Sequence, residues 1–397
     1  MTLEQKISDV QKILLEKNID GWLLYDFHHS NRLACDFLGL SPETMLTRRF
    51  CYWIPKKGDP IAIVHSVETH VLSHAPGKKL IYAAWKLFET HLKDILQGAK
   101  TIAMEYSPRG AIPTASRVDG GMLDLVREQG VQVASSASFL QNFTCVWTEK
   151  QYDLHKEAAE ALDEIAAATW KWIADRLKEE EMITEYTVQQ FMFSEIKKRK
   201  CVMEGAPICA VNQNSANPHY CPALKGSRSV KKGDFILIDL WCKRDLPQAA
   251  QPVYADITRV AVAGKPTARQ EEIFQIVRKA QKAGTDLVRE RITKKKEVRG
   301  CEVDDACRKV IVDAGYGEYF PHRTGHNIHM EDHGPGANID GFETLDERLL
   351  IPRTCFSIEP GIYLPKEFGI RLEYDVYIHE NHTIEVTGGI EDKLFIL

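Results

Sequence analysis

Four acidic residues lie in strings that otherwise have the apolar pattern of buried strands, and this limits the folds open to the chain. They are Asp239 in FILIDLW, Asp256 in VYADITRV, Glu359 in FSIEPGIY and Glu373 in IRLEYDV. An ionised carboxylate in such a strand is unfavourable unless a cation or hydrogen bonds neutralise it. Each residue alone is open to a plainer interpretation, as a turn or surface residue at a strand end. The four together indicate a fold that gathers them around positive charge.

A histidine-rich segment, PHRTGHNIHMEDHG, lies between the second and third of these strings. Four histidines in so short a segment are not typical of core packing. Its His326 completes the series Asp, Asp, His, Glu, Glu along the chain. Two neighbouring divalent cations carry four positive charges, which carboxylate oxygens neutralise while an imidazole fills a further position. The residue types therefore suit a site for two divalent metal ions.

The same strings resemble those of the creatinase, aminopeptidase P and prolidase family of metallopeptidases. The similarity extends to GIRLEYDVYI around Glu373 and covers nearly the whole chain, although it is specific only in the C-terminal half. It implies an α/β (α+β) protein of two domains. These are an N-terminal creatinase-like α/β domain, residues 1–148, and a C-terminal pita-bread metallopeptidase domain, residues 149–397, that holds a dinuclear metal site.

The resemblance also implies a set of metal ligands, namely Asp239, Asp256, His326, Glu359 and Glu373. In this set Asp256 and Glu373 bridge the two ions, and Glu359 additionally moves a proton from the attacking water to the leaving nitrogen. Mn²⁺ is the expected metal, and Co²⁺, Fe²⁺ and Zn²⁺ suit the same ligands.

Further residues match positions that contact the substrate in the family. His219 and His333 match histidines that stabilise charge on the scissile carbonyl, which gives them catalytic as well as substrate-binding roles. His322 matches a histidine that lines the pocket for proline. Arg371 alternates with Glu373 on one face of an expected strand, and we expect it to bind substrate.

The chain departs from the family pattern at three points. Asn327 and His329 stand where glycine is usual, so their side chains either narrow the pocket or fill a surface groove. The loop KRDLPQAAQP between the two metal-binding aspartates is longer than usual. It contains Asp245, a rival ligand that its turn-like surroundings disfavour.

Two other polar groups have plain interpretations. Cys201, Cys209 and Cys221 have a spacing that suits no structural zinc site well. His28 and His29 follow an apolar run, and they form either a solvated loop or a loop that reaches a substrate pocket.

At 397 residues the chain exceeds the usual size of one core, which favours two domains. In the first 140 or so residues, GWLLY, CYWIP, PIAIVH and TIAMEY are typical of strands, while KLFETHLKDILQG and MLDLVREQG have helical periodicity. This alternation predicts an α/β unit with a mixed sheet. Long helices are then expected from Glu149 to about Lys178 and from Glu185 to Arg199.

Composition argues against several classes of protein. A formal net charge of −5 without a long basic run disfavours nucleic acid as a partner. No stretch approaches the roughly 20 apolar residues of a membrane helix, and MTLEQKISDVQK is too polar for a signal peptide. The 10 cysteines contain no CxxC pair, which favours reduced thiols. We therefore expect a cytoplasmic protein.

With the resemblance, these features predict a metal-dependent exopeptidase that hydrolyses an Xaa-Pro bond in a small peptide with proline at its second position. The PH before RTGH is similar to the Xaa-Pro branch of the family. The resemblance also implies a homodimer. Dipeptidase and aminopeptidase action stay open. The alternatives are another hydrolase or lyase on the same fold, as in creatinase, and a noncatalytic peptide-binding module, which would be expected to have lost ligands.

Overall fold

The computed structural model describes residues 1–397. The chain forms two compact units, Met1–Thr144 and Cys145–Leu397. A mixed sheet forms the centre of the first unit. Its strand order is β4-β3-β2-β1-β5-β6. The buried strand β1 (Gly21–Asp26) pairs antiparallel with β2 (Phe50–Pro55) and parallel with β5 (Thr101–Met104). The sheet is therefore mixed, as the sequence predicts.

Helices cover both faces of this sheet. One core contains residues of α1 and α2, and the other contains residues of α3 and α4. The elements of the unit not yet bounded are β3 (Ile61–His65), β4 (Lys78–Tyr82), β6 (Gln132–Ser135), α1 (Leu3–Glu16), α2 (Arg32–Leu38), α3 (Trp85–Leu96), α4 (Gly120–Arg127) and α5 (Ala137–Thr144).

The second unit contains two larger sheets between two pairs of helices. In one sheet the long strands β11 (Phe235–Arg244) and β12 (Ala255–Val262) pair antiparallel, with β9 (Ile208–Val211) on β11 and β19 (Phe395–Ile396) on β12. The other has the order β13-β14-β17-β18. Its strands are β13 (Asn327–Ile328), β14 (Cys355–Ile358), β17 (Tyr374–Ile378) and β18 (Ile384–Thr387).

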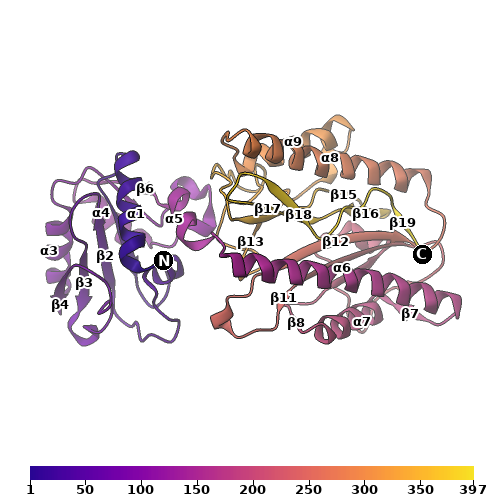
Figure 1. The fold of residues 1–397 in the computed structure, drawn as a ribbon, viewed down its shortest axis with the longest axis horizontal. Helices are drawn as coiled ribbons and strands as arrows, with labels where there is room; N and C mark the ends of the chain where they lie inside the picture. Colours follow the sequence, from indigo (N-terminus) through magenta and orange to yellow (C-terminus); the bar gives the residue numbers. More distant parts are fainter. The chain divides into compact units, whose positions relative to one another are not determined.

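The helices of this unit lie on opposite sides of the strands (Figure 1). Helices α6 (Glu149–Lys178) and α7 (Glu185–Lys198) share one core with β11 and β12. Helices α8 (Ala268–Thr293) and α9 (Gly300–Asp313) share a second core with the other sheet. The remaining strands are β7 (Ile183–Thr184), β8 (Cys201–Val202), β10 (Ser229–Val230) and the hairpin strands β15 (Gly361–Leu364) and β16 (Phe368–Arg371).

Local sequence explains the long helix α6. Thr148 accepts a hydrogen bond from the backbone N–H of Gln151, and the Gln151 side chain accepts one from the N–H of Thr148, which together form a capping box. The expected span, Glu149 to Lys178, is confirmed. No helix in the chain combines the length and the apolar character that a membrane span requires.

Candidate metal centre

The hairpin of β11 and β12 brings the two predicted aspartates onto one face. Asp239 pairs with Thr258, and Asp256 pairs with Trp241, two residues beyond Asp239. Because alternate residues of a strand share a face, the Asp239 and Asp256 side chains point to the same side. The plainer interpretation of Asp239 as a residue at a strand end is wrong, since β11 continues to Arg244. The strand extends because Trp241 and Cys242 continue the pairing with β12.

The second sheet supplies the other three predicted ligands. Glu359 directly follows β14, and Glu373 directly precedes β17. Ile358 pairs with Tyr374, so the two glutamates lie side by side at the end of this strand pair. His326 directly precedes β13, which pairs with β14. The expectation that Arg371 and Glu373 share one strand is wrong, because β16 ends at Arg371 and the chain leaves the hairpin before β17 begins.

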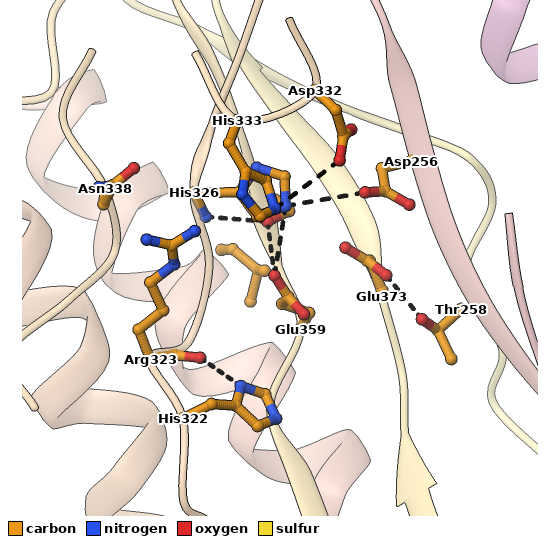
Figure 2. A network of polar contacts seen from close by, with 12 residues as sticks. Asp256, Thr258, His322, Arg323, His326, Asp332, His333, Asn338, Glu359 and Glu373 are labelled. Atoms are coloured by element: carbon orange, nitrogen blue, oxygen red, sulfur yellow. Dashed lines mark hydrogen bonds and ion pairs between the residues drawn. The ribbon is translucent and has the colours of Figure 1, made fainter. Parts of the chain in front are cut away.

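The five side chains converge. His326 Nε2 lies 3.4 Å from Glu359 Oε1 and 3.7 Å from Asp256 Oδ2. Ligand atoms of Asp256, His326 and Glu373 all lie within 4.8 Å of one another. Figure 2 shows His326 between Asp256 on one side and Glu359 below it, with Glu373 beside Asp256.

Arg371 connects Asp239 to this cluster. Its Nη2 donates to Asp239 Oδ2 at 2.5 Å, and its Nε lies 3.8 Å from Glu359 Oε2. Its other partners include the hydroxyls of Thr258 and Tyr363. Arg371 is 5% exposed, so this guanidinium is a buried positive charge held within the carboxylate cluster.

Hydrogen bonds from neighbouring residues hold Glu373 and Asp256 in place. Thr258 Oγ1 donates to Glu373 Oε2 at 2.6 Å, and Arg259 donates to the Glu373 carbonyl at 2.6 Å. The backbone N–H of Asp256 donates to Asp375 Oδ2 at 2.9 Å. Such supporting partners orient metal ligands and raise affinity for the metal.

Burial and mutual repulsion shift the protonation of the cluster. Burial raises the pKa of Glu373 and of Asp256 well above the usual range, and neighbouring carboxylates raise both further. Burial also raises the pKa of Glu359 to about 7. The pKa of His326 is held well below its usual range by burial and by the neighbouring His333. The metal-free cluster therefore favours neutral side chains, and a bound cation would reverse that preference for the carboxyl groups.

The residues present fit a pair of divalent ions. Four carboxyl groups and one imidazole supply oxygen and nitrogen donors, while one guanidinium is the buried positive charge that contacts them. Oδ1 of Asp256 is buried and accepts no hydrogen bond. A buried carboxylate oxygen without a donor is unfavourable, and a metal ion would satisfy it.

The structure also locates the residues expected to contact substrate. His333 has a side chain 65% exposed, and its ring lies 4.1 Å from that of His326, centroid to centroid. His219 is exposed. Burial raises the pKa of Asp239, and Arg371 and His219 are among the neighbours that oppose this rise. His322 donates from Nδ1 to the Arg323 carbonyl, which leaves Nε2 to accept from the Tyr363 hydroxyl at 2.8 Å.

The departures from the family pattern have different consequences. Asn327 is buried, donates to the Cys355 carbonyl and accepts from the backbone N–H of Gly336, so it holds the loop after the histidine segment. His329 is buried, but it belongs to none of the groups with metal-binding geometry. Asp245 is exposed and likewise lies outside those groups.

Neither the three cysteines singled out in the sequence nor the pair His28 and His29 belongs to a group with metal-binding geometry. All 10 cysteines are free, and the cluster at Cys201, Cys209 and Cys221 is absent from the metal-binding groups. His28 and His29 form a turn with positive φ at both residues, and His29 donates its backbone N–H to Asp26.

Sequence reasoning missed two acidic residues beside the ligands. Asp332 lies against His333, and Asp375 accepts the backbone N–H of Asp256. The alternation in YDVYI placed Asp375 on a strand, but only the paired strands show that its carboxyl group supports a ligand. The sequence around Asp332, MEDHG, has the composition of a turn and gave no signal.

Comparisons with known proteins agree with this geometry. A family model, metallopeptidase family M24, matches residues 153–380. The chain is 35% identical over 193 residues to a protein named Xaa-Pro dipeptidase from Lactobacillus delbrueckii subsp. lactis, covering 48% of this chain and 47% of that one. It is 29% identical over 248 residues to an Xaa-Pro dipeptidase from Pyrococcus horikoshii, covering 62% and 64%. These matches thus span about half to two thirds of the relatives' length.

A solved prolidase from Thermococcus sibiricus has the same fold, with a TM-score of 0.64 at 24% identity over 100% of both chains. The fold class predicted from the sequence is confirmed. Because the family model matches more than half of the residues, the chain belongs to metallopeptidase family M24, which confirms the resemblance seen in the sequence.

Proposed function

We propose that this chain is a metal-dependent exopeptidase that hydrolyses Xaa-Pro bonds. The observation that carries the proposal is the convergence of Asp256, His326 and Glu373, with Glu359 and the Arg371-bound Asp239 beside them. Proline specificity is supported by the name of the two relatives reported above, which are both called Xaa-Pro dipeptidase.

In this proposal Asp239, Asp256, His326, Glu359 and Glu373 would hold the two ions. Mn²⁺ is our prediction for the metal, because the site is rich in carboxylate oxygens, although Co²⁺, Fe²⁺ and Zn²⁺ suit the same donors. When bound, the ions would make a coordinated water a nucleophile near neutral pH and polarise the scissile carbonyl.

The chain's own residues then perform the proton transfers and stabilise charge. Glu359 takes a proton from the attacking water and delivers it to the leaving nitrogen. His333 and His219, both exposed beside the cluster, stabilise the negative charge that develops on the carbonyl oxygen. His322, fixed by Tyr363, lines the position of the proline ring.

Arg371 also supports a predicted metal ligand. Its role as a substrate contact stays a prediction. Its observed contacts are with Asp239, Thr258 and Tyr363. They support a role in holding Asp239 in place and balancing its charge.

Hydrolysis of Ala-Pro and Ala-Pro-Ala by chelator-treated protein, before and after Mn²⁺ is returned, tests the proposal. Cleavage of the dipeptide alone, restored by Mn²⁺, would identify a dipeptidase, and cleavage of the tripeptide would identify an aminopeptidase. If the metal-loaded protein cuts neither peptide, proline specificity is wrong and other hydrolase or lyase chemistry on this fold takes precedence. A homodimer and a cytoplasmic location stay predictions.

A further inference from the structure

Asp332 lies against the metal centre, although it is not among the ligands predicted from the sequence. Its Oδ2 is 3.7 Å from Nε2 of His333, and ligand atoms of His326, Asp332 and His333 all lie within 4.8 Å of one another. Figure 2 shows Asp332 on the same side of His326 as Asp256. These three side chains form a second group of donor atoms that shares His326 with the group of Asp256 and Glu373.

Two buried carboxylate oxygens at this place accept no hydrogen bond. They are Oδ1 of Asp256 and Oδ1 of Asp332, and Asp256 as a whole is 4% exposed. His326 lies beside both carboxyl groups, because its Nε2 is 3.7 Å from Asp256 Oδ2 and it shares a group of ligand atoms within 4.8 Å with Asp332. Two neighbouring carboxylates repel each other unless a proton or a cation lies between them, and burial without a partner adds to the cost.

A cation between Asp256 and Asp332 accounts for more of the neighbouring side chains than a shared proton does. A proton would join the two carboxyl groups but would leave the imidazoles of His326 and His333 unexplained beside them. Charge balance points the same way. Arg371 already pairs with Asp239, so only three of the four predicted carboxylates remain to neutralise two divalent ions. Asp332 supplies a fourth.

We propose that Asp332 is a further ligand of the ion held at His326, in a coordination shell that His333 adjoins. The inference rests on the proposed function, since it concerns the same centre. An added carboxylate makes the donor set richer in oxygen, which favours Mn²⁺ over metals that prefer nitrogen or sulfur ligands.

Metal binding by the full-length Asp332→Asn variant tests the inference directly. Asparagine keeps the shape of the side chain and donates a hydrogen bond to Asp256, so it satisfies the pair without a cation. Metal-free proteins are titrated with Mn²⁺ by calorimetry, and the bound metal is counted by mass spectrometry after desalting. We expect wild type to bind two ions and Asp332→Asn to bind one of them at least about tenfold more weakly. Asp245→Asn, which removes an exposed acid, should match wild type.

Asp332→Glu restores a carboxylate and should bind the second ion more tightly than Asp332→Asn. Thermal unfolding of the metal-free proteins shows whether each variant is folded. Two ions bound by Asp332→Asn with wild-type affinity would overturn the inference and leave the proposed function standing. Failure of wild type to bind Mn²⁺ would instead overturn both. If Asp332→Asn unfolds, the comparison of Asp332→Glu with wild type decides, because the longer side chain displaces the carboxylate. Weaker binding of one ion by folded Asp332→Glu supports ligation, and binding of both ions with wild-type affinity contradicts it.

Discussion

The hydroxyl of Thr258 joins two charged side chains of the metal centre, because it donates to Glu373 and accepts from Arg371 Nε. Replacing it with valine keeps the shape of the side chain and removes both bonds. We expect Thr258→Val to weaken metal binding by about 10–100-fold, as loss of a supporting partner does. Calorimetric Mn²⁺ titration measures this. Thr169→Val is the control, because it removes a buried hydroxyl on α6. Equal Mn²⁺ affinities of the two variants would contradict a supporting role for Thr258.

Arg371 is the positive charge that holds Asp239 within the cluster. Removing one partner of a buried ion pair typically costs about 3–5 kcal/mol, because the other charge is left buried and unpaired. We therefore expect Arg371→Met to lower the free energy of unfolding of the metal-free protein by about 3 kcal/mol or more, measured by urea unfolding. A change below about 1 kcal/mol would show that the pair contributes little. Arg269→Met, which removes an exposed ion pair with Glu367, should have a small effect.

Single residues also show where sequence reasoning succeeds and where it ends. Asp256 and Glu373 were predictable because a carboxylate within an apolar string needs a compensating charge. Asp332 was not, because it follows no strand and its neighbours are polar. Its place beside Asp256 depends on how the segment after His326 folds back, and that fold depends on buried contacts such as those of Asn327.

At the scale of elements, burial decided which predictions were confirmed. In the first unit, the expected strands β1, β2, β3 and β5 occupy the interior of the sheet, where long apolar runs are required. The two strands without a clear pattern, β4 and β6, are the sheet edges. Both are only partly buried, so packing imposes no apolar repeat on them.

Helix α6 is joined to the sheets by one buried histidine. His155 Nδ1 lies 2.7 Å from the Tyr254 carbonyl, and Nε2 lies 2.7 Å from Thr387 Oγ1. Burial lowers the pKa of His155 from 6.5 to about 4. Above pH 6.5 the ring is neutral in both states, and its contribution to stability is fully present. As the pH falls from 6.5 to 4, the unfolded chain takes up a proton that the folded chain excludes, so stability is lost across this window.

A His155→Gln variant should therefore show a flatter dependence of stability on pH. Between pH 7 and pH 5 we expect wild type to lose about 2 kcal/mol more than the variant, from the size of this pKa shift. Urea unfolding at the two pH values measures the difference. Parallel losses in the two proteins would contradict a neutral, buried His155.

At the scale of the whole molecule, the predicted ligands all lie in residues 145–397, and that unit has its own cores. We expect a chain of residues 145–397 to fold and to bind Mn²⁺ with the stoichiometry of the full chain, measured by calorimetry and metal analysis. A folded fragment without metal would show that the first unit is required for the site.

We propose that side chains of the paired strands β11 and β12, of the residues next to β14 and β17, and of one histidine segment hold two divalent ions. Anomalous diffraction from crystals grown with Mn²⁺ tests it most directly. We expect two peaks among Asp239, Asp256, His326, Glu359 and Glu373, each at about 2.2 Å from carboxylate oxygens. No peak among these side chains, or peaks bound only elsewhere on the chain, would contradict it.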